Sequence, residues 1–395
     1  MGDASPPAKV ALVTGANGIT GSAIIKHLVK NTTDADFSAI IATSRTPLVF
    51  DVSDPRLTFI AIDFLKPASE LIPTLKDSLS SVTHVYFSSY IHNNNFVALN
   101  ASNEALFQNF IASVPQVAPN LQNIVLQTGG KHYGVHLSPV PAPCYEYYPR
   151  TLPFNVPNFY FDQEDRLKAA SEASGRWSWN VIRPDAIIGA APKPQGMNEA
   201  ITLLVYILTC KKMGEEPLMP TNEFYWNGFE DGSDIRLIAD LTVWASTSEK
   251  PEVKNQEFNI NNGEVFTWRW MWPRLTKLLG VETSSDRKFE AGALKNLVNG
   301  VPCQEQTFAA WATEETKNAW VELCVEKGLS KQQAEDTWSG CCFQVMDWVY
   351  SRTWCNVLSM QKVRKVGWFG WMDSFDSFKE TWEEMRDLGQ VPDWR

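Results

Sequence analysis

The chain has 395 residues, of which 44% are hydrophobic, 12% aromatic and 20% charged. This composition excludes disordered and fibrous proteins, and the length predicts two or three cooperating units whose core needs no metal or disulfide. The formal net charge of -10 argues against a surface that binds nucleic acids or anionic membranes. The longest apolar run, residues 200–210, is too short for membrane insertion. Seven cysteines without a CxxC motif or a secretory segment indicate reduced thiols, so we expect a cytoplasmic protein.

Short apolar runs alternate with helical patterns along the first half of the chain. This alternation predicts an α/β fold of the Rossmann type, with a doubly wound parallel sheet. We divide the chain into a flexible tail (1–8), a nucleotide-binding domain (9–196, with strands regained from 225–262) and a smaller, mostly helical, Trp-rich substrate-binding region (197–395). The expected strands are Val10–Thr14, Ser38–Thr43, Leu57–Ile62, His84–Phe87, Asn123–Gln127 and Val181–Pro184.

A glycine-rich turn, Gly15-Ala-Asn-Gly18-Ile-Thr-Gly21, follows the first strand and opens the first helix. Its amides and the helix dipole face the place where a pyrophosphate would lie. The GxxGxxG spacing is the variant used by extended short-chain dehydrogenases. A tight turn with close packing alone would also explain the glycines, but we favour a nucleotide site.

The end of the second strand distinguishes between the two nicotinamide cofactors. NAD enzymes usually place an acid there, whereas this chain has Ser44 and Arg45, which could hold a 2′-phosphate. We therefore expect NADP(H), although Arg45 could also be a solvated loop cation. Asp63 follows the third strand, where it could meet the adenine amine or cap a helix. The expected cofactor contacts are Gly15, Asn17, Gly18, Ile19, Ser44, Arg45, Asp63, Ser88, Thr128 and Pro184.

Two motifs in the middle of the chain indicate the chemistry. Thr128-Gly-Gly-Lys131-His-Tyr133 follows a strand, and Asn158-Phe-Tyr160-Phe-Asp-Gln-Glu-Asp165 opens a helix, whereas no Tyr-x-x-x-Lys pair stands at the expected place. With these motifs the chain resembles the progesterone 5β-reductase/iridoid synthase (PRISE) family of short-chain dehydrogenases, which shows TGxKHY and NFYYxxED. The resemblance extends to the glycine turn and to segments at 82–85, 179–184, 226–234 and 258–263, and so spans nearly the whole chain.

The resemblance implies NADPH-dependent reduction of a C=C bond conjugated to a carbonyl. Tyr160 would hydrogen-bond the carbonyl oxygen, and Lys131 would assist through its positive charge and ribose contacts. Phe161 replaces the second tyrosine of the family motif. Two alternatives stay open: 1,2-reduction of a carbonyl or imine, and a cofactor-retaining cyclase or binding protein without redox chemistry. A buried core tyrosine and a surface lysine are the structural alternatives for the pair.

The substrate pocket departs from the family pattern at Ser88-Ser89-Tyr90 and in the loop at 135–150. We expect a small, apolar, conjugated carbonyl substrate and no metal, and we leave a homodimer open. Fourteen of the 16 tryptophans lie from Trp226 onward, in the part that packs over the nicotinamide edge in this family, so we expect an aromatic lid. The expected pocket-lining residues are Tyr90, Tyr133 and Phe154.

Overall fold

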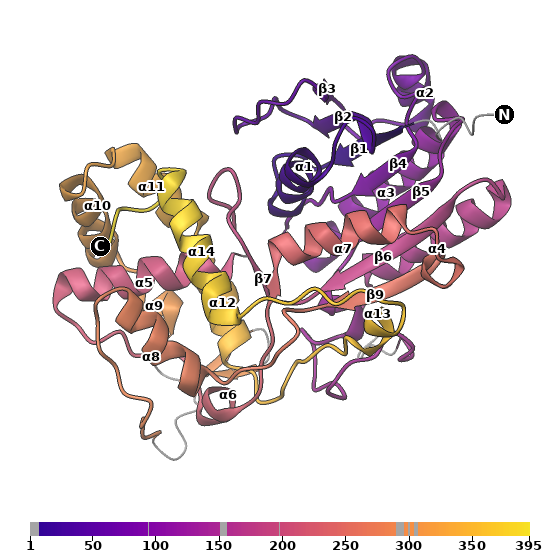
Figure 1. The fold of residues 1–395 in the computed structure, drawn as a ribbon. Helices are drawn as coiled ribbons and strands as arrows, with labels where there is room; N and C mark the ends of the chain where they lie inside the picture. The colour runs from indigo at the N-terminus through magenta and orange to yellow at the C-terminus, as the bar shows by residue number, and fades with distance from the viewer. Residues whose placement is uncertain are drawn as a thin grey trace.

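The computed structural model describes residues 8–93, 95–150, 156–196, 198–289, 296–298, 301–303 and 307–395. Its central element is a seven-stranded parallel sheet in the order β3-β2-β1-β4-β5-β6-β9 (Figure 1). The order reverses between β1 and β4, and the crevice outside the carboxyl ends of these strands is the usual ligand site of such sheets. The strands are β1 (Lys9–Thr14), β2 (Phe37–Ser44), β3 (Leu57–Ala61), β4 (His84–Phe87), β5 (Asn123–Gln127), β6 (Ser178–Pro184) and β9 (Gln256–Ile260).

The six expected strands are confirmed, and their composition explains why they form. Five consecutive residues of β1 are buried, and all four residues of β4 are, because helices cover both faces of the sheet. One face packs against α1 (Ile19–Asn31) and α7 (Ile235–Thr247). The other packs against α2 (Ala68–Leu75), α3 (Phe96–Val117) and α4 (Phe159–Ser174).

A mostly helical part stands beside the sheet (Figure 1, left) and has its own apolar core. Trp272 and Trp382 are buried in this core and donate their indole N–H groups to the carbonyls of Pro217 and Ala200. The tryptophans therefore build the packing of this part of the molecule. Its helices are α5 (Glu199–Met213), α6 (Glu223–Asn227), α8 (Trp268–Leu278), α9 (Phe308–Trp311), α10 (Glu314–Glu326), α11 (Lys331–Gly340), α12 (Phe343–Tyr350) and α14 (Ser374–Asp387).

The second half of the chain also returns to the sheet. It supplies α7 and the edge strand β9, which pairs with β6 in parallel from Asn180–Gln256 to Pro184–Ile260. The return of strands that we expected within 225–262 is thus present. We find no membrane-spanning candidate among the described helices, each being too short or insufficiently apolar. Smaller elements are η1 (Gly130–Tyr133), η3 (Pro251–Val253), α13 (Gln361–Lys365) and the strand pairs β7 (Ile187–Ile188) with β8 (Ser233–Asp234) and β10 (Asn296–Val298) with β11 (Val301–Cys303).

Candidate active site

A cavity of about 1490 Å³ lies at the carboxyl ends of the central strands. Its walls come from the sheet, from the start of α5 and from α12. The volume exceeds the roughly 300–1,000 Å³ of an ordinary ligand pocket, so the cavity can hold a dinucleotide and a second small molecule together. All ten expected cofactor residues line it, as do three expected catalytic or substrate residues: Lys131, Tyr160 and Tyr90.

The glycine turn is shaped for a phosphate. Gly15 has φ +66°, and a Cβ there would lie 2.7 Å from the carbonyl oxygen of Ser88, so a side chain would collide with the backbone that follows β4. Gly18 is the N-cap residue of α1, where no side chain caps the first turn and no acidic residue lies in it. The N-terminal amides and dipole of α1 are therefore available to an anion, as a pyrophosphate requires.

The loop after β2 is fixed by Asn17. Its side-chain amide donates to Ser44 Oγ (3.1 Å) and to the carbonyl of Pro47 (2.9 Å), and its Oδ1 accepts from the N–H of Val49 (3.1 Å). These bonds position the loop that carries Arg45. Arg45 is exposed and pairs with no carboxylate of the described residues, an arrangement suited to binding a 2′-phosphate.

Asp63 lines the same end of the cavity and has a local structural task. Its Oδ1 accepts from the N–H of Leu65 (3.0 Å), and its carbonyl accepts from the N–H of Lys66, which closes a turn after β3. It caps no α-helix, because α2 begins later, with Pro67 as its N-cap residue. A carboxylate oxygen can still meet an adenine amine from this position.

Asn158 joins the two motifs that contain the expected catalytic residues. As the N-cap residue of α4, its Oδ1 accepts from the N–H of Tyr160 (3.1 Å), and its Nδ2 donates to the carbonyl of Lys131 (2.8 Å). One side chain thus holds the main chain of both expected catalytic residues. The sequence placed Asn158 in a motif, but its bond to a residue 27 positions away could not be derived from spacing.

The Tyr160 hydroxyl lies against the Gly129-Gly130 turn, 3.6 Å from a Cβ built on Gly129, and has no hydrogen-bond partner among the described residues. Burial, and then the proximity of Tyr90, raise the pKa of Tyr160, so its hydroxyl keeps its proton at neutral pH. Burial lowers the pKa of Lys131, and no described carboxylate pairs with its ammonium group. The cavity thus contains a neutral O–H donor and a lysine that no internal acid neutralises.

A buried ionic network lies behind this pair. Arg183 of β6 donates hydrogen bonds from two guanidinium nitrogens to the carboxylate of Glu164 of α4, the shortest being 2.8 Å. His132 Nδ1 lies 3.1 Å from Glu164 Oε1. Burial opposes the ionisation of Glu164, but His132 and Arg183 outweigh it and hold the pKa of this carboxyl below its usual range. The network fixes η1, α4 and β6 relative to one another.

Tyr133 corrects one of our expectations. Its hydroxyl donates to Asn259 Oδ1 (2.5 Å) and accepts from Arg183 (3.3 Å), and the side chain is not among the residues that line the cavity. It therefore belongs to the ionic network and not to the substrate pocket. Phe154 lies outside the described residues.

The expected aromatic lid is also corrected. Of the tryptophans, all of them described, Trp348 alone lines the cavity. Part of the wall is instead polar, with Asp185 at the end of β6, Glu199 at the start of α5, and Arg352 and Asn356 after α12. Burial raises the pKa of Asp185 to about 6 and that of Glu199 to about 7. Sequence patterns offered no signal for this wall, because its members come from three distant segments.

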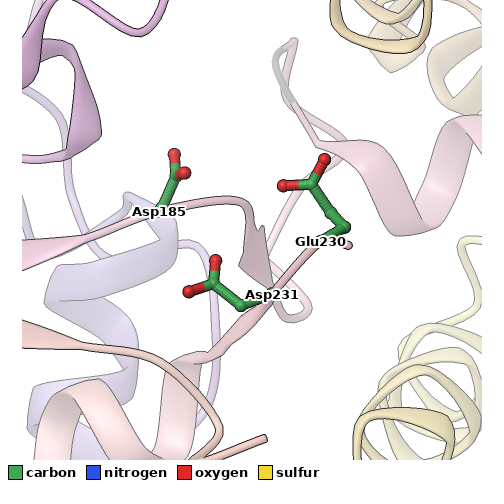
Figure 2. A group of neighbouring side chains, drawn as sticks. All are labelled: Asp185, Glu230 and Asp231. Carbon is green, nitrogen blue, oxygen red and sulfur yellow. The ribbon is translucent and has the colours of Figure 1, made fainter. Parts of the chain in front are cut away.

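Two further acids lie behind Asp185. Figure 2 shows Asp185 with Glu230 and Asp231, and one oxygen from each of the three carboxyl groups lies within 4.8 Å of the others. Such a spacing can accommodate a cation or shared protons. Arg352 already supplies a positive charge here, 2.9 Å from Glu230 Oε2.

Comparisons with known proteins agree with this geometry. A family model described as a PRISE-like Rossmann-fold domain matches residues 11–380. The short chain dehydrogenase gsfE of Penicillium aethiopicum is 45% identical over 386 residues, 97% of this chain and 99% of that protein. The 3-oxo-Delta(4,5)-steroid 5-beta-reductase of Arabidopsis thaliana is 29% identical over 329 residues, 83% of this chain and 80% of the relative. A UDP-glucose 4-epimerase structure from Thermotoga maritima, 14% identical, aligns with a TM-score of 0.61 over 95% of this chain and 98% of its own, and shows the fold alone.

Proposed function

Because the chain belongs to the family of PRISE-like Rossmann-fold proteins and is a reductase of the short-chain dehydrogenase type, we propose that it reduces a C=C bond conjugated to a carbonyl. We propose NADPH as its cofactor. The observation that carries the proposal is the pair of hydrogen bonds by which the Asn158 side chain holds the backbone of Lys131 and Tyr160. It sets the two residues in the cavity that the glycine turn and Arg45 also line.

Tyr160 and Lys131 supply the electrostatic part of the reaction. NADPH, when bound, supplies the hydride, which adds to the β-carbon of the substrate. Negative charge then grows on the carbonyl oxygen, and the neutral Tyr160 hydroxyl donates a hydrogen bond to it. Lys131 adds a positive field and can bind ribose hydroxyls through its three N–H donors. Neither residue loses a proton in this step.

The residues at the two ends of the cavity support the choice of cofactor and substrate class. Arg45 and Ser44, without an acid at the end of β2, favour NADPH over NADH. The Arabidopsis relative is named for a steroid whose 3-oxo group and Δ4,5 bond form a conjugated enone. We therefore propose an enone or enal as the substrate of this chain, and leave its skeleton undefined.

Tyr160→Phe tests the role of the hydroxyl. The ring stays in place against Phe159, but the O–H donor is lost, so we expect turnover of a reducible enone to fall by about 10²–10³-fold. Binding of NADPH, measured by fluorescence titration, should be unchanged. The assay follows NADPH oxidation across a panel of small enones, with identification of the product. Unchanged turnover in the variant would remove Tyr160 from the mechanism.

A further inference from the structure

Asp185 lies next to the Gly129-Gly130 turn that leads into Lys131. It directly follows Pro184 at the end of β6, and its Oδ1 is so close to Gly130 that a Cβ there would lie 2.6 Å away. The Tyr160 hydroxyl lies against the preceding residue, Gly129, and both side chains line one cavity. A substrate whose carbonyl oxygen meets Tyr160 would therefore share its cavity with a second group from this chain that can carry a proton.

The two acids behind Asp185 are deeply buried. Glu230 is 3% exposed and Asp231 is fully buried, and the three side chains come from two segments that meet at this point (Figure 2). Glu230 Oε1 and Asp231 Oδ1 have no hydrogen-bond partner in the part of the chain that the structure describes. Carboxylates this close together in a buried site cannot all be ionised, so the group retains protons, and the oxygens without donors are where they can reside.

The surroundings favour a proton over a metal ion in this space. The Arg352 guanidinium donates to Glu230 Oε2 (2.9 Å) and to the Tyr225 hydroxyl (2.9 Å), and its charge disfavours a second cation. Asp231 Oδ2 accepts from Asn261 Nδ2 and from the N–H of Leu358, both at 2.7 Å. The Asn356 amide donates to Asp185 Oδ2 and holds that carboxyl in place.

We propose that Asp185 is a general acid that delivers a proton to the α-carbon of the substrate, and that Asp231 and Glu230 form a buried proton reserve behind it. This inference rests on the proposed reduction of a conjugated C=C bond. Hydride addition at the β-carbon leaves an enolate, whose oxygen Tyr160 binds. The O–H bond of Asp185 then breaks, the proton forms a new C–H bond at the α-carbon, and the carbonyl is restored. The Asp185 carboxylate regains a proton from its acid neighbours, which are reloaded from solvent.

The electrostatics of the site agree with this role. Burial raises the pKa of Asp185, and Arg352 opposes the rise only in part. Because the acid form is the active one, the proposal predicts that turnover falls as the pH rises through the apparent pKa of the group as a whole. The titratable and charged groups that act on Asp185 or respond to it are Cys144, Glu199, Glu230, Asp231 and Arg352.

The decisive experiment reads the face on which the α-carbon is protonated. A substrate with an α-methyl group, such as 2-methylcyclohex-2-enone, is reduced with NADPH in D₂O. The native enzyme should place deuterium on one face of the α-carbon. In Asp185→Asn we expect turnover to fall by about 10²–10⁴-fold. The turnover of this variant should no longer decrease at high pH, and deuterium should appear on both faces of the α-carbon of the product. Single-faced deuteration with an unchanged pH profile in Asp185→Asn would overturn the proposal.

A matched control removes a different buried carboxyl. Glu146 is 6% exposed, its pKa is raised by burial, and it does not line the cavity. In Glu146→Gln the side-chain carbonyl can still accept from the N–H of Asn259, so this variant should keep single-faced deuteration and the native pH profile. Loss of facial selectivity in both variants would mean that general loosening of the protein, and not Asp185, sets the face, and would contradict the proposal.

A second readout needs neither cofactor nor turnover. Infrared difference spectra of the free protein should show protonated carboxyl C=O bands that bleach as the pH rises, and the band that belongs to Asp185 should be missing in Asp185→Asn while those of its acid neighbours remain. No such band, or activity that EDTA abolishes and Mg²⁺ restores, would overturn the proton-sharing account in favour of ionised carboxylates or a metal. If the product is an alcohol, the proposed function fails instead, while the infrared result still reports on the acid group.

Discussion

At the scale of a single residue, Arg45 is the side chain that we propose selects NADPH over NADH. Its guanidinium lies at the cavity edge, on a loop that Asn17 fixes, and a 2′-phosphate there would form charge-assisted hydrogen bonds. Because the side chain is exposed, we expect Arg45→Ala to raise the KM for NADPH by roughly ten-fold, which corresponds to about 1.4 kcal/mol. Initial-rate kinetics with both cofactors provide the measurement.

The KM for NADH should stay unchanged in Arg45→Ala, because NADH has no 2′-phosphate to lose. Arg176→Ala is the matched control, since Arg176 contacts the carbonyls of Pro115 and Pro119 away from the cavity. Equal increases in both KM values would contradict the assignment of Arg45.

The residues that we expect to contact the cofactor could be brought to one place from sequence because a local pattern defines their positions. The glycine turn and the strand ends form the crevice wherever such a sheet is built, and all ten expected residues line one cavity. Tyr133 and Asp185 could not be placed in this way. The partner of the Tyr133 hydroxyl, Asn259, is 126 residues away, and the acids next to Asp185 come from a segment that reaches it only after the chain has built α5 and α6.

At the scale of elements, Glu164 holds α4, the helix that carries Tyr160, on β6 and η1. In Glu164→Gln the buried Arg183 loses the carboxylate that it hydrogen-bonds and keeps only Glu257, 4.0 Å away; breaking a buried pair of this kind costs about 3–5 kcal/mol. We expect the free energy of unfolding, measured in urea, to fall by at least about 2 kcal/mol, because glutamine keeps part of the hydrogen bonding.

Asp162 provides the control on the same helix. It pairs with Arg166 at i, i+4, and both side chains are about a third or more exposed, so Asp162→Asn should cost less than about 0.5 kcal/mol. Similar losses in the two variants would mean that the network contributes no more than a surface pair.

The elements that carry Lys131 and Tyr160 were partly predictable. The strand before Thr128 and the helix beginning near Asn158 follow from sequence pattern, and both motifs lie where these elements begin or end. What the pattern lacked was the contact between them. The Asn158 bridge and the Arg183–Glu164 pair depend on how α4 packs against β6, which is tertiary information.

At the scale of the whole molecule, buried acids lie where the helical part meets the sheet. Burial raises the pKa of Glu199 to about 7 and of Glu230 to about 8, although Tyr350 and Arg352, respectively, oppose the rise. A carboxyl with a raised folded-state pKa binds its proton more tightly when folded. Its contribution to stability is full below the unfolded pKa and is lost as the pH rises through the folded value.

We therefore expect the free energy of unfolding to fall as the pH rises from about 5 to about 8, with a slope of up to about 1.4 kcal/mol per pH unit for each such carboxyl. Chemical denaturation at several pH values measures it. Glu230→Gln should flatten the slope, because the amide does not titrate. A native profile that stays level or rises over this range, or a variant with the native slope, would contradict the buried acids as its cause.

The fold of the whole molecule was predictable where strands and helices alternate along the chain. It was less predictable in the second half, where this alternation fades. The alternating strands and helices gave the parallel sheet, whereas the abundance of tryptophan in the second half suggested a lid over the cofactor. The structure uses these rings for the core of the helical part, because its helices pack mainly on one another and large rings fill the space between them.

The position of hydride transfer tests the central claim most directly. The protein is supplied with NADPH that carries deuterium at the transferable position of its nicotinamide, together with an enone that it turns over, and the product is analysed by NMR. The account predicts a saturated carbonyl compound with deuterium on the β-carbon. An alcohol with deuterium on the former carbonyl carbon would contradict it and would assign the protein to 1,2-reduction.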